Sequence, residues 1–295
     1  MGVTSEDLQQ WVGKRHNVRE TLSPVQVRQM AALTDDLPRL QEPAAAPLPL
    51  GWHWLYFNPI EVQSKLGPDG HPLRGDFLPP VALERRMWAG SRLTWLRPFR
   101  VGQAVDKEST ILKVEPKSGR SGDMVIVTVA HSYRDAQGLL LEEEHDIVYR
   151  DKASAAETEA LRQTGERIRA GEHVFEREGA YVQAVRADPV MLQRYSAATF
   201  NGHRIHYDAD YSRNVEGYPG LVVHGPLIAT LVLRLVEQQA APGRYVVAFE
   251  FRAIRPSFDL GAFHVHASRI DGQRLQVWST NNLGQVGIEG WVTLG

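Results

Sequence analysis

The sequence predicts an α+β fold built from two similar halves, each with one helix followed by an antiparallel sheet that can wrap around it. Two observations lead to this prediction. The order of elements repeats along the chain, with one apolar helical candidate before each set of alternating strands. An Arg-Pro pair also stands at matching places in the two strand sets, as Arg97-Pro98 and Arg255-Pro256. Two unrelated α+β domains with the same turn chemistry are the alternative, but the shared order of elements favours duplication.

The first half, residues 1–150, contains an irregular connection over residues 35–50, where proline and alanine are frequent. A helix is predicted over residues 80–90, PVALERRMWAG, at the start of the repeated pattern. Apolar and polar residues alternate beyond it, which is typical of strands with one buried face. The predicted strands lie within residues 92–103, 124–133 and 145–150.

Residues 151–172 are predicted to form an exposed helical linker between the halves, because Ala, Glu, Arg and Leu recur there at helical spacing without β-branched runs. The second half, residues 173–295, repeats the plan of the first. A helix is predicted over residues 225–239, GPLIATLVLRLVEQQ, and alternating strands follow between residues 249 and 294.

The composition is that of a soluble globular protein, with 43% apolar residues, 23% charged residues and a formal net charge of −2. This balance gives no reason to expect a nucleic-acid or membrane partner. The chain has no cysteine, which excludes disulfides, thiolate metal sites and a cysteine nucleophile. The N-terminus has no signal-peptide pattern, and the longest apolar stretch, around residues 225–236, is too short to span a bilayer. We therefore expect a cytoplasmic protein.

The strongest chemical signal is FNGHRIHYD, residues 200–208, which gathers two histidines, an arginine, an asparagine and an aspartate. Histidine is the side chain that transfers protons most readily near neutral pH. Asn201 and His206 are five residues apart, so an irregular loop can direct both side chains at one water molecule. A lone histidine is more often structural, and the neighbouring polar residues make catalysis the better interpretation here.

A second signal follows at VVHGP, residues 222–226, where the predicted second-half helix begins. Gly225 presents a backbone N–H at the N-terminus of that helix, and the helix dipole favours negative charge there. Such a group can stabilise the oxyanion of an ester or thioester carbonyl. His224 is expected to contribute to the substrate-binding loop by orienting it rather than by transferring protons.

The two stretches, FNGHRIHYD and PGLVVHGPL, resemble the active site of the MaoC-like (R)-specific enoyl-CoA hydratases, whose motif is written D-x-N-P-[IL]-H. The resemblance implies a hot-dog fold, in which a long helix lies in a curled antiparallel sheet. It extends to the double hot-dog members of the family, among them itaconyl-CoA and mesaconyl-C4-CoA hydratases and type 2 hydroxyacyl-thioester dehydratases. The similarity is specific over residues 194–230, and elsewhere it is architectural.

The resemblance implies three catalytic residues. His206 stands at the family's catalytic histidine, Gly225 at the glycine whose N–H binds the thioester oxygen, and Asn201 where the family has an aspartate. His203 and Arg204 replace the family's Asn-Pro. An amide is not a general base, so two alternatives stay open. Either His206 acts alone as base and then acid while Asn201 orients the water, or the site is inactive; the retained histidine and glycine favour the first.

The implied reaction is the reversible hydration of an α,β-unsaturated acyl-CoA thioester. Arg204 is a candidate substrate-binding residue, because a guanidinium can form a bidentate pair with a carboxylate. This predicts a short branched dicarboxylic acyl group, such as itaconyl or C4-linked mesaconyl; a structural ion pair is the alternative role for Arg204. Dehydration of fatty (R)-3-hydroxyacyl thioesters is the alternative reaction. No cofactor is expected beyond the CoA of the substrate, and a homodimer is expected.

Three other interpretations are less favoured. His203, His206 and Asp208 have some of the spacing of a metal site, but the loop around Gly202 argues against rigid ligands. A hot-dog thioesterase needs a carboxylate on the central helix, which offers only Glu237. For a non-catalytic acyl-CoA-binding module, Asn201 is the sole argument.

The first half has no counterpart of FNGHRIHYD before its predicted helix. Residues 66–80, LGPDGHPLRGDFLPP, are predicted to form a loop. We therefore expect a non-catalytic first half that shapes the acyl pocket. Aromatic residues are its candidate walls, although each of them is individually more typical of a core: Trp52, Trp54, Tyr56 and Trp88.

Overall fold

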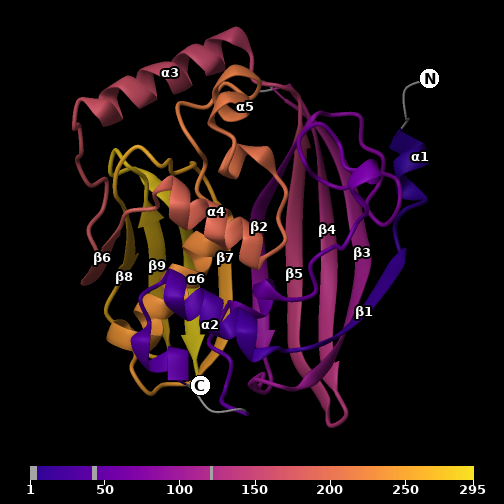
Figure 1. Cartoon of the computed structure of the whole chain (residues 1–295), viewed down its shortest axis with the longest axis vertical. Coiled ribbons are helices and arrows are strands. Elements are labelled where there is room, and N and C mark those ends of the chain that lie inside the picture. The colour runs from indigo at the N-terminus through magenta and orange to yellow at the C-terminus, as the bar shows by residue number, and fades with distance from the viewer. Residues whose placement is uncertain (1–4, 42–44, 120–121) are drawn as a thin grey trace.

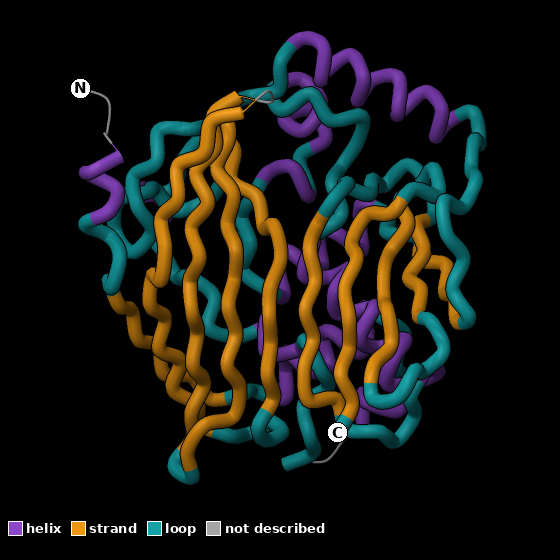
Figure 2. The backbone as a smooth tube through the Cα atoms, turned by 180° about the vertical axis from the view of Figure 1, so that it is seen from behind, coloured by secondary structure: helices purple, strands orange, loops and turns teal. Residues whose placement is uncertain are grey.

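A long antiparallel sheet forms the body of the molecule (Figures 1 and 2). The structure is a computed structural model that describes residues 5–41, 45–119 and 122–295. Its strands are β1 (Arg15–Thr21), β2 (Arg85–Trp95), β3 (Ala104–Gly119), β4 (Gly122–Asp135), β5 (Gly138–Arg150), β6 (Tyr181–Val185), β7 (Val246–Ala253), β8 (Phe263–Ala267), β9 (Arg274–Thr280) and β10 (Val286–Leu294).

The strand order is β1-β3-β4-β5-β2-β7-β10-β9-β8-β6. Strands β1–β5 come from the first half of the chain and β6–β10 from the second, so each half contributes one continuous part of the sheet. The two parts join where β2 pairs with β7, from Gly90 opposite Arg252 to Thr94 opposite Ala248. This β2–β7 junction makes one sheet of the two halves.

Helices cover one face of the sheet, while the strands are seen uncovered from behind (Figures 1 and 2). The helices are α1 (Ser5–Gln9), α2 (Pro24–Leu33), α3 (Ala155–Arg169), α4 (Pro189–Ala198), α5 (Ala209–Asn214) and α6 (Gly225–Leu235), which a π-helical turn extends over Val236–Ala240. Short 3-10 turns occupy Leu37–Gln41, Trp52–Leu55, Gln63–Lys65 and Arg204–His206. None of the helices described in the structure is long and apolar enough to cross a membrane.

Helix α6 lies in the centre of the second half and packs against β6, β8 and β9. Its residues from Leu227 to Leu235 are nearly all buried, as expected for a helix that is apolar on every side. The helix begins at Gly225, after His224 in extended backbone geometry and with a proline in its first turn. The buried helix therefore fixes the position of the Gly225 backbone N–H.

The α+β class is confirmed, but the helix predicted over residues 80–90 is wrong. Those residues lead into strand β2, which starts at Arg85. Beyond Gly90 the strand alternates between core and solvent, and this longer pattern overrides the helix-forming residues at its start. The first half instead has the shorter helix α2, which Ser23 caps by accepting a hydrogen bond from Val25 N–H. A long central helix is therefore present only in the second half of the chain that the structure describes.

Helix α3 occupies Ala155–Arg169, within the segment 151–172. Ser154 and Glu157 form a capping box at its start, with the side chain of each accepting a hydrogen bond from the backbone of the other. Figure 1 shows this helix above the second-half sheet, at the same end of the molecule as α5.

Candidate active site

The first element of the site is the N-terminus of α6. Among the described residues, none accepts a hydrogen bond from the N–H of Gly225, and Pro226 has no N–H to offer. Trp88 of β2 packs directly over this glycine: a Cβ added at Gly225 would lie 3.2 Å from Trp88 Cε3. The helix end therefore presents a free donor beneath an aromatic ring, which suits a carbonyl oxygen that gains negative charge.

His206 lies in the 3-10 turn Arg204–His206 and is 8% exposed. Its Nδ1 lies 2.7 Å from the carbonyl oxygen of Val222. Because a carbonyl only accepts, Nδ1 carries the proton and Nε2 keeps its lone pair. Burial lowers the pKa of His206 to about 4, against the opposing effect of the Val222 hydrogen bond. The imidazole is therefore neutral near pH 7 and can accept a proton at Nε2.

His224 stacks on His206, with ring centroids 3.7 Å apart, and so links His206 to the adjacent Gly225. Its Nε2 lies 2.9 Å from the Ser196 hydroxyl, and Tyr195 packs edge-on against its ring. Burial holds the pKa of His224 well below its usual value. These contacts fix the His224 ring in place, as expected for a residue that orients the loop before Gly225.

Asn201 follows α4, at the point where Phe200 turns the chain through a positive φ of 50°. Its backbone N–H donates to Ser196 O, and its Oδ1 accepts from the backbone N–H of His203 across 3.0 Å. The amide oxygen thus shapes the loop. Among the described residues no acceptor engages the side-chain NH₂ group, which can therefore donate to the oxygen of a water molecule.

Arg204 is engaged by structural partners. Its Nε and Nη2 donate to Asp208 Oδ2 at 3.0 and 2.8 Å, and Nη1 donates to Pro68 O at 3.0 Å. The guanidinium also lies over the Tyr211 ring, 4.1 Å from its centroid. Of the two roles considered for Arg204, these contacts are those of the structural ion pair. The contact of Arg204 with a substrate carboxylate stays a prediction, and the guanidinium would have to keep or exchange these partners to make it.

A loop of the first half lies against this turn. The backbone N–H of Arg204 donates to Asp69 O across 2.9 Å, and the Pro68 contact of its side chain comes from the same loop. Gly70 and Gly202 approach so closely that a Cβ added at Gly70 would lie 1.9 Å from Gly202 O. We call this contact between residues 66–72 and 201–206 the loop junction. It brings side chains of both halves into one site.

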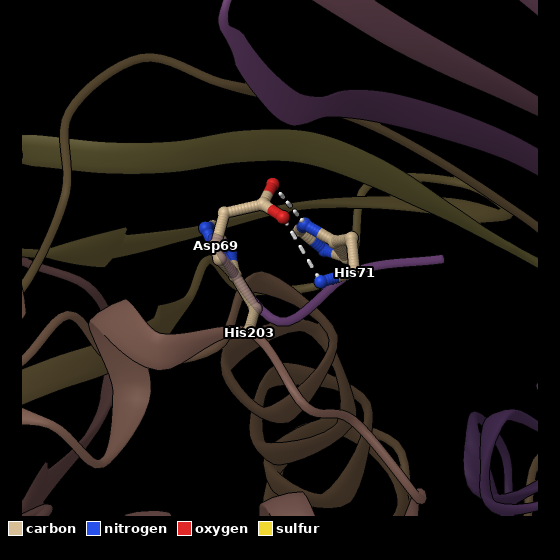
Figure 3. Close-up of side chains that lie close together, drawn as sticks. All are labelled: Asp69, His71 and His203. Carbon is tan, nitrogen blue, oxygen red and sulfur yellow. Dashed lines mark hydrogen bonds and ion pairs between the residues drawn. The ribbon is translucent and has the colours of Figure 1, made fainter. Parts of the chain in front are cut away.

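Asp69, His71 and His203 meet at the loop junction (Figure 3). Asp69 Oδ2 lies 2.9 Å from His71 Nδ1, and Asp69 Oδ1 accepts from the His71 backbone N–H at 3.0 Å. The His71 ring lies 4.1 Å from that of His203, which meets His206 edge-on at 5.3 Å. Burial and the nearby Arg86 lower the pKa of His71, and burial lowers that of His203. Burial alone would raise the pKa of Asp69, but the hydrogen bonds from His71 hold it below its usual value.

The three side chains place potential metal-ligand atoms within 4.8 Å of one another. This group differs from the predicted one, since Asp208 is paired with Arg204 instead. Both oxygens of Asp69 already accept hydrogen bonds from His71, and Arg86 lines the same cleft as Asp69 and His203. A divalent cation would have to displace these hydrogen bonds from Asp69, and the positive charge of Arg86 would repel it. The arrangement is therefore better described as a hydrogen-bonded acid–base group.

Sequence reasoning missed Asp69 and His71. The signal available was the pair itself, an aspartate and a histidine two residues apart in the turn-forming stretch GPDGHP. Trp88, predicted as a pocket wall, lies over Gly225, with the Trp54 ring edge-on against it at 5.2 Å. Trp52 and Tyr56 are buried in the main core.

Arg86 is the remaining cation of the cleft. It lies opposite Tyr149 of β5 in the sheet register, whereas the neighbouring Arg85 pairs with Glu216 at 3.0 Å. In the part of the chain that the structure describes, no carboxylate lies within ion-pair distance of Arg86. This half-buried guanidinium lies in the same cleft as His203 and is a candidate to bind an anionic group of a ligand.

The family model described as "Hydroxyacyl-thioester dehydratase type 2" matches residues 51–259, a range that contains the loop junction, His206 and Gly225. The chain belongs to this family. A mesaconyl-C(4)-CoA hydratase of Chloroflexus aurantiacus is 39% identical over 293 residues, which cover 99% of this chain and all of the relative. A mitochondrial hydroxyacyl-thioester dehydratase type 2 of Schizosaccharomyces pombe is 28% identical, over 70% of this chain and 73% of its own.

Solved structures confirm the architecture of this type 2 dehydratase family member. A MaoC-like dehydratase superposes with a TM-score of 0.67 at 15% identity, covering 97% of this chain and 99% of its own. A Mycobacterium tuberculosis protein with a double hot-dog fold matches with a TM-score of 0.55 at 14% identity, covering 96% of each chain. The predicted double hot-dog fold is confirmed, and the chain is a hydro-lyase.

Proposed function

We propose that the chain reversibly hydrates an α,β-unsaturated acyl-CoA thioester whose acyl group carries a carboxylate, as mesaconyl-C4-CoA does. The observation that supports this most is the convergence of His206 and Gly225. A neutral histidine with a free Nε2 stacks on the residue next to a free helix-terminal N–H. A base and an oxyanion donor at adjacent positions are the two groups that hydration of an enoyl thioester requires.

In this mechanism the thioester oxygen accepts from the N–H of Gly225 beneath Trp88. His206 Nε2 takes a proton from a water molecule that the NH₂ group of Asn201 holds through its oxygen. The water oxygen bonds to the β-carbon, and the electron pair of the double bond moves towards the thioester oxygen. General acid–base catalysis supplies about 10²–10⁴ in rate, and one oxyanion donor about 10²–10³. Neither contribution suffices alone, so the two groups act together.

The substrate class rests on Arg86 and on the relative that is 39% identical. In a C4-linked mesaconyl thioester, the free carboxylate is attached to the carbon that receives the hydroxyl group. Its cationic partner must therefore lie beside the catalytic histidine. Arg86 is our candidate, because it lines the same cleft as His203, whose ring contacts that of His206, and because it has no ion-pair partner among the described residues. Burial makes such a charge-assisted hydrogen bond stronger than it would be in water.

Dehydration of (R)-3-hydroxyacyl thioesters with fatty chains is the second candidate. The description of the family and its yeast members favour it. The same three groups serve both directions of the reaction, so only the acyl group distinguishes the two functions.

The deciding experiment supplies the purified protein with mesaconyl-C4-CoA, itaconyl-CoA and crotonyl-CoA separately. Loss of the enone absorbance together with the mass gain of one water is the expected result, with mesaconyl-C4-CoA preferred and with no reaction in His206→Ala. A preference for crotonyl-CoA or longer enoyl chains would support the fatty-acyl alternative. Release of free CoA without hydration would contradict both.

Three further properties are part of this proposal. The reaction needs no cofactor other than the CoA carried by the substrate, since a neutral histidine and a backbone donor suffice for it. A homodimer is supported by the open sheet edge at β6, where Val182 is exposed, and light scattering tests it. A cytoplasmic location is consistent with a chain that has no cysteine, and cell fractionation tests it.

A further inference from the structure

We propose that His71, held by Asp69, is a second proton-transfer residue of the active site, beside His203 and close to His206. This inference rests on the proposed hydration reaction. It assigns a catalytic role to a loop of the first half, the half that the sequence predicted to be non-catalytic. The carboxylate that Asn201 does not provide would thus come from Asp69.

The position of the loop supports this role. The backbone N–H of Arg204 binds Asp69 O, the Arg204 guanidinium binds Pro68 O, and Gly70 and Gly202 meet backbone to backbone. These contacts come from the residues immediately before His71 and immediately after Asn201. A loop attached in this way holds its side chains in a fixed relation to the catalytic turn, as acid–base catalysis requires.

The orientation of His71 supports it as well. The carboxylate of Asp69 lies 2.9 Å from Nδ1, so Nδ1 carries a hydrogen and Nε2 is left to accept or donate a proton. A carboxylate in this place also stabilises the imidazolium that forms when Nε2 is protonated. The same Asp–His arrangement orients the general base in serine proteases.

The rings of the three histidines lie next to one another. The His71 and His203 rings are 4.1 Å apart, and the His203 and His206 rings are 5.3 Å apart. His206 Nδ1 is committed to Val222, which leaves Nε2 as its exchanging atom. Burial lowers the pKa of all three, so each is neutral at rest.

The proton balance of the hydration step closes with these groups. The water oxygen bonds to the β-carbon while its proton passes to His206 Nε2, and the electron pair of the double bond forms an enolate held by Gly225. His206 releases this proton to solvent. His71 Nε2 takes up a proton from solvent while Asp69 balances the charge, and it delivers that proton to the α-carbon as the enolate collapses. The product carries one added water, and every side chain regains its starting state.

The test compares His71→Ala and Asp69→Asn with the wild type on the preferred enoyl-CoA. His71→Ala should lower kcat about 100-fold with KM unchanged, and added imidazole should restore part of the rate. Asp69→Asn keeps an oxygen for the His71 backbone N–H and should lower kcat about 10-fold. His16→Ala, a change at an exposed histidine outside the site, is the matched control and should leave kcat unchanged.

An unchanged kcat in His71→Ala would overturn the inference while leaving the proposed hydratase intact. Loss of activity that imidazole does not restore would also overturn it, as would activity that EDTA removes and zinc restores. If His71→Ala lacks the native circular dichroism spectrum, Asp69→Asn decides, and an unchanged kcat there counts against the inference. A wild type that hydrates none of the enoyl thioesters would contradict the proposed function instead.

Discussion

The backbone N–H of Arg204 donates to the carbonyl oxygen of Asp69 across 2.9 Å, so a loop of the first half is bonded directly to the catalytic turn of the second. This contact joins residues that are far apart in the chain, as does the 3.0 Å bond from the Arg204 guanidinium to Pro68, 136 residues away. The geometry of the site therefore depends on both halves at once.

The first prediction concerns the close approach of Gly70 to Gly202. Gly70→Ala should lower both kcat and the free energy of unfolding, because its Cβ would overlap Gly202 O at 1.9 Å. Gly102→Ala is the matched control, since Gly102 has a similar positive φ but nothing within 4 Å of its Cβ position. The control should lose only about 1–2 kcal/mol through backbone strain and should keep its activity. Urea denaturation and steady-state kinetics measure both, and equal losses in the two variants would argue against a functional loop junction.

The second prediction concerns Gly225 and Trp88. Gly225→Ala keeps the backbone N–H but places a Cβ 3.2 Å from the indole, so the ring must shift by a few tenths of an ångström. We expect kcat to fall about 10-fold or more, because displacing an oxyanion donor approaches the cost of losing it. Adding Trp88→Phe to this variant should recover activity relative to Gly225→Ala alone. If the loss of kcat in the double variant equals the product of the losses in the two single variants, the Trp88 ring does not position the Gly225 donor.

The third prediction is a pH dependence of stability. The pKa of His206 is about 4 in the folded chain, because of burial, and near 6.5 in the unfolded chain. Below pH 6.5 the unfolded chain binds a proton at His206 that the folded chain binds only near pH 4. The free energy of unfolding therefore decreases as the pH falls from about 6.5 to about 4, and the contribution of His206 is fully present above about pH 6.5. One such group accounts for about 3 kcal/mol. Denaturation at several pH values should therefore show a weaker slope in His206→Gln than in the wild type, and identical slopes would contradict the assignment.

The fourth prediction separates the two arginines near the site. Arg86→Gln should reduce kcat/KM for mesaconyl-C4-CoA about 10- to 100-fold relative to crotonyl-CoA, since a charge-assisted hydrogen bond to the carboxylate is lost. Arg204→Gln should lower the melting temperature and affect both substrates alike, because its guanidinium holds Asp208 and Pro68. The reverse result, in which Arg204→Gln alone changes the ratio, would return the carboxylate-binding role to Arg204.

The parts of the site that the sequence predicted are local ones. One stretch of sequence contains His206, Gly225 and the helix that follows. A buried helix preceded by a loop can be predicted from its run of apolar residues. The Asx turn of Asn201 is local too, yet its consequence for the amide oxygen appears only in the structure. The predicted catalytic roles of Asn201, His206 and Gly225 await the experiments described above.

The parts that were missed depend on long-range contacts. Residues 66–72 have the pattern of a loop, and nothing in that pattern shows that Gly70 meets Gly202. Residues 80–90 were predicted as a helix because they stand as an apolar segment before the first set of strands, whereas pairing of β2 with β5 and β7 decides the conformation from Arg85 onward. A local sequence pattern does not show which distant strand a segment will pair with.

The β2–β7 junction limits which parts of the chain can be exchanged with those of a related protein. Strands of the two halves share one hydrogen-bonded ladder there, and the loop junction carries side chains of one half into the site of the other. A half taken from a homologue would function only if it brought a matching ladder register and a matching loop. The two halves are therefore parts of one functional unit and are not exchangeable modules.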